Sequence, residues 1–302
     1  IASCFIITVL LFIRLIKPLP KRIMYPLWSL VFLRLVMPFS FPTRWSLFNF
    51  TGGLVKRLVT VETVTKIEVP FFKNWMAMNS IGAAESYSPL EYKTESLRQI
   101  FTVGSLVWAV IATAALLTAV ILYALTCGEL NKAVRIRDNL YRSDMLLSPV
   151  LIGVFKTKVI LPSALDPDSP EGLMVLRHED VHRWRLDNLW RVIAVCITCL
   201  HWFNPLAWVM LKAFFTDMEL SCDEKVIRKY GVEERRAYAS ALLRFAEDKR
   251  MLISSAFGRS GIKVRIVNVL NYKKLTVIGA VASTVFLLAV AAVLTTNPQL
   301  RG

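Results

Sequence analysis

The sequence is poor in charged residues, and acidic residues are the scarcer kind. Of its 302 residues 20% are charged, and 37 Lys and Arg stand against 22 Asp and Glu; an ordinary soluble domain has about 25% charged residues. Hydrophobic residues make up 55% of the chain. This composition excludes disordered and collagen-like chains and argues against a wholly soluble protein. The charges that are present argue against a chain made only of membrane spans, so we expect a membrane anchor with one charged globular part.

Cysteine and histidine are also scarce. The five Cys are too few for the disulfide framework of a secreted domain. Three of them lie in apolar runs, where buried free thiols are expected. The sequence shows no internal repeat and no low-complexity segment. These absences leave one group of residues, described below, to carry the chemistry.

Four apolar segments predict about four transmembrane helices. A membrane-spanning helix needs about 20 apolar residues. Gln99–Gly128 has 30 residues without a charge and Leu275–Leu300 has 26, so both qualify. Met24–Phe41 is a plausible span of about 18 residues. Ile1–Ile13 is too short and has no small-residue cleavage site, so we interpret it as the remainder of a membrane helix rather than as a signal peptide.

Charge in the connections predicts the orientation. The first connection carries Lys17, Lys21 and Arg22 and no acid, and such loops prefer the cytoplasm. Residues 129–274 would then be cytoplasmic, and their 24 basic and 17 acidic residues agree with this. Because topology explains the basic excess, no direct binding to nucleic acid is expected. The predicted division is two N-terminal spans in 1–41, an extracytoplasmic loop 42–98, a span 99–128, a cytoplasmic domain 129–274 and a C-terminal span 275–302.

The predicted cytoplasmic domain begins with strands and continues with helices. Ser148–Pro162 is rich in β-branched residues and ends at a proline, which predicts a strand or hairpin. Pro170 suits a first helical position, and we predict a helix from about Glu171 to beyond Asp187. Residues 192–215 form two short apolar helices separated by Asn204-Pro205. At about 1.5 Å per residue the first reaches about 18 Å, so we prefer core helices there, with a further membrane segment left open.

The motif that carries chemistry is His178-Glu179-Asp180-Val181-His182. Residues four apart share one face of a helix, so both imidazoles can meet one metal ion. Glu179 lies between them and can reach a water on the same metal. This H-E-x-x-H pattern is typical of the zinc-binding helix of metallopeptidases.

A catalytic zinc site also needs a third protein ligand and an open position for water. Arg185 and Asn188 stand where the metzincin form would have Gly and His, so that form is excluded. The alternative is a carboxylate from a later helix, and Glu219 is the natural candidate. Asp223 follows it at i+4 and could accept the second N–H of a ligand histidine. Asp187 could support the site in the same way, or simply pair with a neighbouring arginine.

Three stretches and one strand region give the sequence a family resemblance. RHEDVHRWRLDNLW (177–190), LHWFNPLAW (200–208) and ELSCDEKVI (219–227) are similar to segments of the BlaR/MecR family of membrane zinc metallopeptidases. The strand region 148–162 and the order of the predicted spans resemble that family too, so the likeness covers nearly the whole chain. It implies an α-helical membrane protein with a cytoplasmic, mainly α (α+β) metalloprotease domain of the gluzincin type.

The resemblance implies a function and a set of roles. His178, His182 and Glu219 would bind one catalytic Zn²⁺, and Glu179 would be the base. The protein would lie in a bacterial plasma membrane with its site facing the cytoplasm. It would cleave a cytoplasmic repressor-like protein or its own chain, around Ser254, Ser255, Ala256 and Phe257. A homodimer is left open.

Some expectations from the family stay open. Its antibiotic sensors carry an outer penicillin-binding domain, for which no room remains after the last predicted span; either that domain is missing from this sequence or this member never had one. Two other functions remain as alternatives. One is a housekeeping membrane protease of the prenyl-protein-processing or heat-shock type, and the other is a non-catalytic transducer that keeps the zinc fold.

Overall fold

The computed structural model divides the chain into two compact units. It describes residues 20–36, 41–43, 94–146, 148–231, 234–250, 256–272 and 296–298, together with residues 7, 11, 14, 279, 281 and 285. The smaller unit comprises Ile1–Ile6, Ser29–Ile111 and Ile278–Gly302. The larger unit comprises Ile7–Trp28 and Ala112–Val277 and contains the H-E-x-x-H motif. Each unit is described by itself.

Two of the predicted spans differ from the structure at their ends. Helix α2 (Lys21–Val36) stops before Pro38, whose ring disfavours helical geometry in the preceding residue. The predicted end of that span, Phe41, lies instead in strand β1 (Phe41–Thr43), which pairs in parallel with β6 (Thr296–Pro298). The end of the predicted C-terminal span is therefore a short strand. Its helical residues 279, 281 and 285 are described; the rest of it, like most of 1–13 and of 42–98, lies outside the described residues.

Helix α5 (Thr94–Leu130) contains the predicted span 99–128. Among the described residues, its segment Gln99–Leu130 is the one helix long and apolar enough to cross a membrane, with a mean hydropathy of 2.4. Only 6% of that apolar stretch is buried by the protein. A helix that is apolar yet exposed suits a lipid environment better than water. Length and composition thus support one membrane helix here, and the described residues do not establish four.

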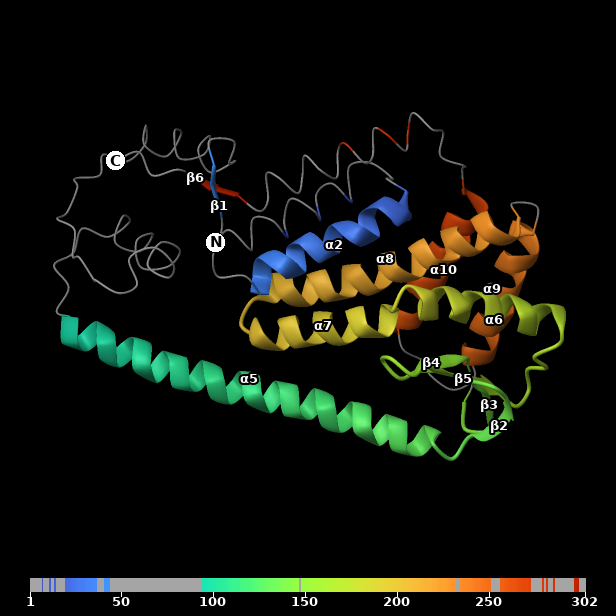
Figure 1. Ribbon diagram of the computed structural model, residues 1–302, viewed down its shortest axis with the longest axis horizontal. Coiled ribbons are helices and arrows are strands. Elements are labelled where there is room, and N and C mark those ends of the chain that lie inside the picture. Colours follow the sequence, from blue (N-terminus) through green and yellow to red (C-terminus); the bar gives the residue numbers. More distant parts are fainter. Residues whose placement is uncertain are drawn as a thin grey trace. The chain divides into compact units, whose positions relative to one another are not determined.

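Among the described residues, the larger unit holds five complete helices and a four-stranded sheet, together with the N-terminal part of α2 and the C-terminal part of α5 (Figure 1). The helices are α6 (Pro170–Trp184), α7 (Asp187–Leu200), α8 (Pro205–Tyr230), α9 (Arg235–Arg250) and α10 (Ala256–Leu270). The strands are β2 (Val134–Arg137), β3 (Leu140–Ser143), β4 (Val150–Ile152) and β5 (Lys158–Pro162), in the order β2-β3-β5-β4. Helix α8 packs against α6, α7 and α10 and so forms the centre of the unit.

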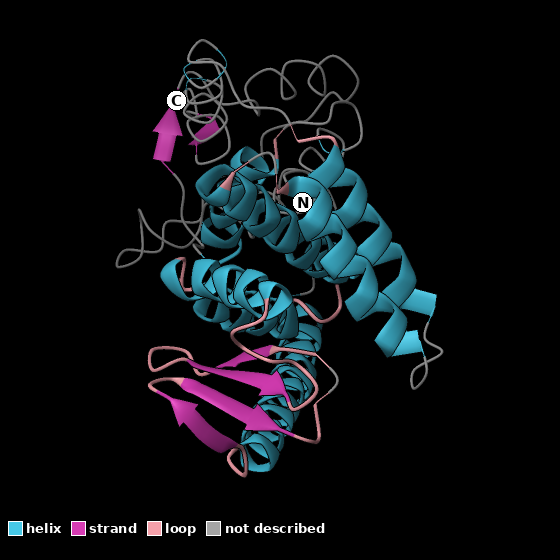
Figure 2. Cartoon of the chain, turned by 90° about the vertical axis from the view of Figure 1, so that its right-hand side faces the viewer, coloured by secondary structure: helices cyan, strands magenta, loops and turns pink. Residues whose placement is uncertain are grey.

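The predicted hairpin within 148–162 is confirmed as the antiparallel pair β4 and β5. Gly153 leaves β4 at a φ of +92°, where a Cβ would lie 2.3 Å from the carbonyl oxygen of Lys156. Sequence reasoning missed β2 and β3, which are only four residues long and carry charges. The sheet forms one end of the unit in Figure 2, below the helices. Its buried Leu151 and Leu161 pack with Val175 of α6, so the sheet fixes the position of the motif helix.

Helix α6 begins as predicted and ends earlier than predicted. Ser169 caps it by accepting a hydrogen bond from the backbone N–H of Gly172, and Pro170 occupies the first helical turn. The prediction of a helix to beyond Asp187 is wrong, because α6 ends at Trp184. Leu186 then adopts a left-handed φ of +54°. This conformation, uncommon for a residue with a Cβ, lets the chain turn sharply into α7.

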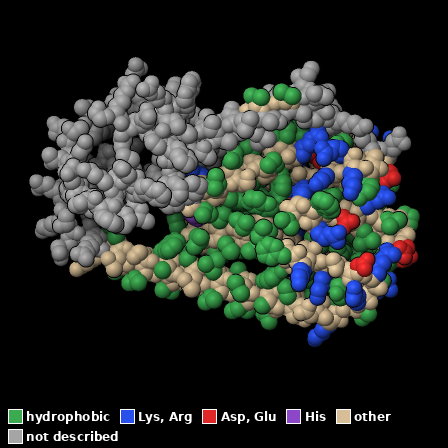
Figure 3. Space-filling model, in the orientation of Figure 1, with side chains coloured by type: hydrophobic (Ala, Val, Ile, Leu, Met, Phe, Trp, Pro, Cys, Tyr) green, Lys and Arg blue, Asp and Glu red, His purple; other side chains and the backbone are tan. Residues whose placement is uncertain are grey.

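The apolar segment 192–215 forms the adjacent ends of α7 and α8. Asn204 caps α8 by accepting from the N–H of Leu206, and Pro205 takes its first turn, so the predicted break is confirmed. Ala194 and Ile197 are buried between the helices. Other apolar residues, among them Trp208, remain half exposed. Figure 3 shows hydrophobic side chains over α7 and α8, while charged side chains gather at the end that holds the sheet and α6.

A second core joins the remaining helices under the motif. Its buried residues come from α6, α8, α9, the C-terminal end of α10 and the residue two positions after it: Val181, Cys222, Val226, Ile227, Tyr238, Ala239, Val269 and Tyr272. Val181 lies inside the motif itself and is 3% exposed. Val181 lies three positions after His178, so its burial in this core holds the side of α6 that carries His178 against the other helices of the core.

Candidate metal centre and active-site cavity

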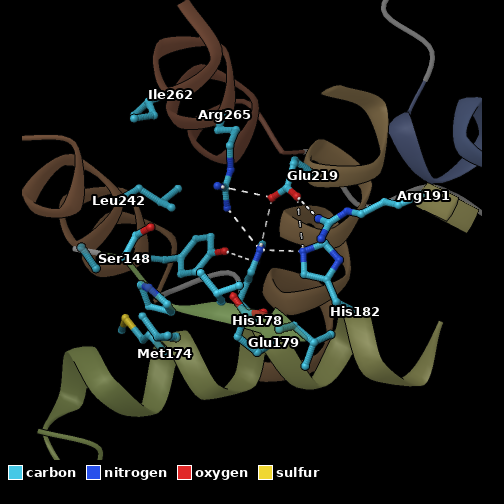
Figure 4. Close-up of a pocket in the computed structure, with 16 residues that line it drawn as sticks. Ser148, Met174, His178, Glu179, His182, Arg191, Glu219, Leu242, Ile262 and Arg265 are labelled. Atoms are coloured by element: carbon cyan, nitrogen blue, oxygen red, sulfur yellow. Dashed lines mark hydrogen bonds and ion pairs between the residues drawn. The ribbon is translucent and has the colours of Figure 1, made fainter. Parts of the chain in front are cut away.

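Both motif histidines point toward one carboxylate. His178 and His182 lie one turn apart on α6, and their Nε2 atoms are 3.0 Å from each other. Glu219 on α8 places Oε2 3.5 Å from Nε2 of His178 and Oε1 3.6 Å from Nε2 of His182. The three groups converge in Figure 4. Two nitrogen ligands of one tetrahedral zinc ion lie about 3.3 Å apart, so this donor set fits such an ion.

The second ring nitrogen of His182 is held by Asp187. Nδ1 of His182 lies 2.6 Å from Oδ2 of Asp187, whose side chain is fully buried. The carboxylate can only accept, so Nδ1 carries the hydrogen and the lone pair of Nε2 is directed at the site. The left-handed turn at Leu186 brings Asp187 back to this position. The arginine that pairs with Asp187 is Arg185, with Nε 3.1 Å from Oδ1.

The second ring nitrogen of His178 is held through a tyrosine. The hydroxyl of Tyr238 donates to Oδ1 of Asp223 at 2.6 Å and lies 2.8 Å from Nδ1 of His178. A phenol has one hydrogen to donate, so it must accept from Nδ1–H. Asp223 itself lies 3.3 Å from Nδ1, which is compatible with the supporting role expected for it. The two imidazoles thus have the same tautomer.

Two arginines hold the carboxylates. Arg265 on α10 donates Nε and Nη2 to the two oxygens of Asp223, at 2.9 and 2.8 Å, a bidentate pair. Its Nη1 also lies 3.4 Å from Oε2 of Glu219. Arg191 on α7 donates Nη2 to Oε1 of Glu219 at 2.8 Å. Glu219 is therefore oriented from both sides before any ligand is considered.

These contacts shift the ionisation of the groups. Burial alone would raise the pKa of Asp223, but Arg265 and His178 outweigh it and lower the pKa to about 2. Burial would also raise the pKa of Glu219, yet His182, His178 and Arg265 hold it well below its usual value. Burial opposes protonation of His178, whereas Cys222, Tyr238 and Asp223 raise its pKa well above 6.5. A metal held by Nε2 of both histidines would have to displace any proton from these nitrogens.

A cavity of about 370 Å³ opens over these groups. Glu179, 9% exposed, lines it together with His178, His182 and Glu219. The edge strand β4 contributes Val150 to the wall. The apolar part of the lining is completed by Leu151, Met174, Val175, Ala241, Leu242 and Ile262. Its size suits a few residues of an extended peptide, since ligand cavities commonly measure about 300–1,000 Å³.

Cys222 is a second candidate for a third metal ligand. Its sulfur, with a nitrogen of each motif histidine, forms a group whose donor atoms lie within 4.8 Å of one another. However, the sulfur is 3.5 Å from Nδ1 of His178, the nitrogen that faces away from Glu219, and Cys222 is 0% exposed. It does not line the cavity, whereas Glu219 does. A ligand exchange site needs access to water, so geometry favours Glu219.

Sequence reasoning missed three contributors to the site. Arg265 and Arg191 have no spacing relation to the motif, and only packing of α10 and α7 against α8 brings them there. Tyr238 lies on α9, 60 positions after His178, and likewise carries no local signal. The expected self-cleavage segment stays a prediction: residues 254 and 255 lie outside the described residues, and Ala256–Phe257 begin α10.

Comparisons with known proteins match the chain to a peptidase family. The family model described as BlaR1 peptidase M56 matches residues 1–269. The regulatory protein BlaR1 of Bacillus licheniformis is 28% identical over 239 residues, which cover 70% of this chain and 40% of that protein. The regulatory protein BlaR1 of Staphylococcus aureus is 23% identical over 308 residues, covering 91% of this chain and 51% of that protein. The chain therefore spans about half, or less, of the length of these relatives.

Proposed function

The chain belongs to the BlaR1 peptidase M56 family, and we propose that its larger unit is a membrane-bound zinc endopeptidase of signal transduction. Membership implies a metallopeptidase. The observation that supports zinc and its place is the convergence of two Nε2 atoms and one carboxylate within 3.6 Å of each other. We propose His178, His182 and Glu219 as ligands and Glu179 as the catalytic base.

The residues of the chain would have separate roles in peptide hydrolysis. Bound by the three ligands, zinc would lower the pKa of a coordinated water toward about 7 and polarise a peptide carbonyl. Glu179, on the cavity wall, would take a proton from the attacking water and pass it to the leaving amine. Asp187 and Tyr238 would keep each Nε2 lone pair directed at the metal.

The substrate would bind as an added strand along β4. This strand pairs with β5 on one side only, and Val150 and Leu151 line the cavity. An extended peptide can pair with such an edge through its backbone. Asn188 donates to the carbonyl oxygens of Leu151 and Gly153 at 3.0 and 2.8 Å. The carbonyl of the middle residue of β4 is therefore occupied, which would confine pairing to Val150 and the residues before it.

The family name and the apolar helix α5 support a membrane location and a regulatory substrate. The proposed substrate is a cytoplasmic repressor-like protein or the chain's own segment 254–257. The cytoplasmic orientation rests on the basic first connection and the net positive charge of 129–274.

The test is a single substitution at the proposed base. Glu179→Gln keeps the shape of the side chain but cannot take a proton, so the rate of peptide cleavage should fall by about 10²–10⁴-fold. The assay would use the full chain in detergent with zinc, a mixed peptide library and mass spectrometry. Glu171→Gln, at the distant start of α6, serves as the control and should cleave normally. A parent that binds zinc but cleaves nothing, in the library or in its own chain, would favour a non-catalytic transducer.

A further inference from the structure

The N-terminal helix α2 reaches the metal site through one side chain. The hydroxyl of Tyr25 donates to Oδ1 of Asp187 at 2.7 Å, across 162 positions of the sequence. The other oxygen of the same carboxylate is the one that holds Nδ1 of His182 at 2.6 Å. All three residues belong to the larger unit. Tyr25 is thus two hydrogen bonds from the imidazole whose other nitrogen, Nε2, would bind the metal.

We propose that Tyr25, on α2, is a positioning residue for His182. This inference rests on the proposed function, because it assumes that His182 is a metal ligand. Tyr25 does not touch the metal or the substrate. It acts by fixing the carboxylate that fixes the imidazole.

The geometry gives Tyr25 a specific role. A carboxylate held through one oxygen can still turn about its Cβ–Cγ bond, and a contact on the second oxygen stops that rotation. Oδ1 of Asp187 has two donors, Tyr25 and Nε of Arg185. The guanidinium of Arg185 in turn lies over the ring of Tyr25, 4.1 Å from its centroid. Tyr25 therefore supplies one donor directly and supports the other through a cation–π contact.

Helix α2 is itself attached to the helix that carries Glu219. The first two N–H groups of α2, from Lys21 and Arg22, donate to the carboxylate of Glu224 at 2.9 and 3.2 Å. An acidic side chain is favourable at this end of a helix because of the unpaired N–H groups and the helix dipole. Trp28 donates its indole N–H to the buried Asp217 at 3.1 Å. Glu219 lies between these two anchors on α8.

Stacking on Phe214 holds the ring of Tyr25 against α8. Its ring lies 5.7 Å from that of Phe214, at an interplanar angle of 16°. A phenylalanine at position 25 would keep this stacking and the contact with Arg185. It would remove the hydroxyl alone, which makes Tyr25→Phe a clean probe of the hydrogen bond to Asp187.

The experiment measures zinc affinity of the full chain in detergent by competition with a chelator. Loss of a group that supports a histidine ligand commonly weakens metal binding about 10–100-fold; Tyr25 is one bond more remote, so about a tenfold loss is expected for Tyr25→Phe. The absorption bands of the Co²⁺-substituted protein should also change, because the orientation of one imidazole changes. Trp28→Phe is the matched control, since it removes a hydrogen bond of α2 to Asp217 and leaves Asp187 untouched.

Each outcome decides the inference. A weaker zinc affinity and altered cobalt bands in Tyr25→Phe, with parent-like values in Trp28→Phe, support it. Parent-like zinc affinity in Tyr25→Phe overturns it while the proposed function stands. Equal losses in both variants also overturn it, because α2 would then act only through general stability. A parent chain that binds no zinc removes the proposed function and this inference together.

Discussion

Each motif histidine is held by its own carboxylate, and the two carboxylates accept hydrogen bonds from different side chains. Asp187 is held from α2 and by Arg185, whereas Asp223 is held by a bidentate Arg265 and by Tyr238. Asp223 has a side-chain exposure of 0%. Removing either the buried carboxylate or the cation paired with it leaves the other charge without compensation. Substitutions of these few residues should therefore change both the stability of the fold and the affinity for a metal.

Asp223→Asn tests this at the level of one residue. The pKa of Asp223 is about 2 in the fold against 3.8, which corresponds to about 2 kcal/mol of stability. Because the folded-state pKa is depressed, this contribution is fully present above about pH 4 and disappears as the pH falls through about 2. The variant should therefore lose at least about 2 kcal/mol at pH 6, and the gap to the parent should shrink by pH 3. Chemical unfolding in detergent at the two pH values measures it. An equal gap at both would contradict the assignment.

The sequence could not predict the site residues that only tertiary packing brings to the motif. His178, Glu179 and His182 could be predicted because one helical turn relates them. Glu219 and Asp223 could be proposed because the zinc chemistry demands a further carboxylate. Arg265 lies 87 positions from His178 and carries no local signal. Only the fold shows which arginine among many reaches the site.

At the level of elements, the break between α6 and α7 places Asp187 beside His182. The sequence predicts one helix through Asp187, because nothing but a leucine stands at the turn. In that continuous helix Asp187 would be five positions beyond His182 and would face elsewhere. The left-handed conformation of Leu186, which is 44% exposed, lets the chain turn back so that Asp187 contacts His182. A conformation that costs an ordinary residue about 1–2 kcal/mol thus stands beside a functional contact.

Substitutions at Leu186 test the break. Leu186→Pro cannot adopt the positive φ and loses the N–H that donates to Arg183 at 3.2 Å. It should lower the free energy of unfolding by about 2–3 kcal/mol and weaken zinc binding, since Asp187 is displaced. Leu186→Gly adopts the turn without strain and should retain zinc like the parent. Thermal unfolding and zinc titration measure both. Normal zinc binding by Leu186→Pro would show that the turn is dispensable.

At the scale of the whole molecule, the chain joins a charged unit that carries the H-E-x-x-H motif to apolar helices. Composition alone predicted this division, since 20% charged residues are too few for one soluble body and too many for membrane spans only. The number of spans could not be predicted equally well. The boundaries of short apolar segments depend on prolines and on long-range pairing, as the strand pair β1 and β6 shows. Helix α5 could be predicted because 30 residues without a charge leave few alternatives.

The most direct test of the account is the zinc content of the purified full chain after saturation and removal of loosely bound metal. The parent should hold about one zinc per chain. Glu219→Ala should lose it, while Cys222→Ser, which changes the buried sulfur on the far side of His178, should keep it. A parent without zinc would contradict the metal centre as a whole. Zinc kept by Glu219→Ala and lost by Cys222→Ser would move the third ligand to the sulfur and contradict the site as built here.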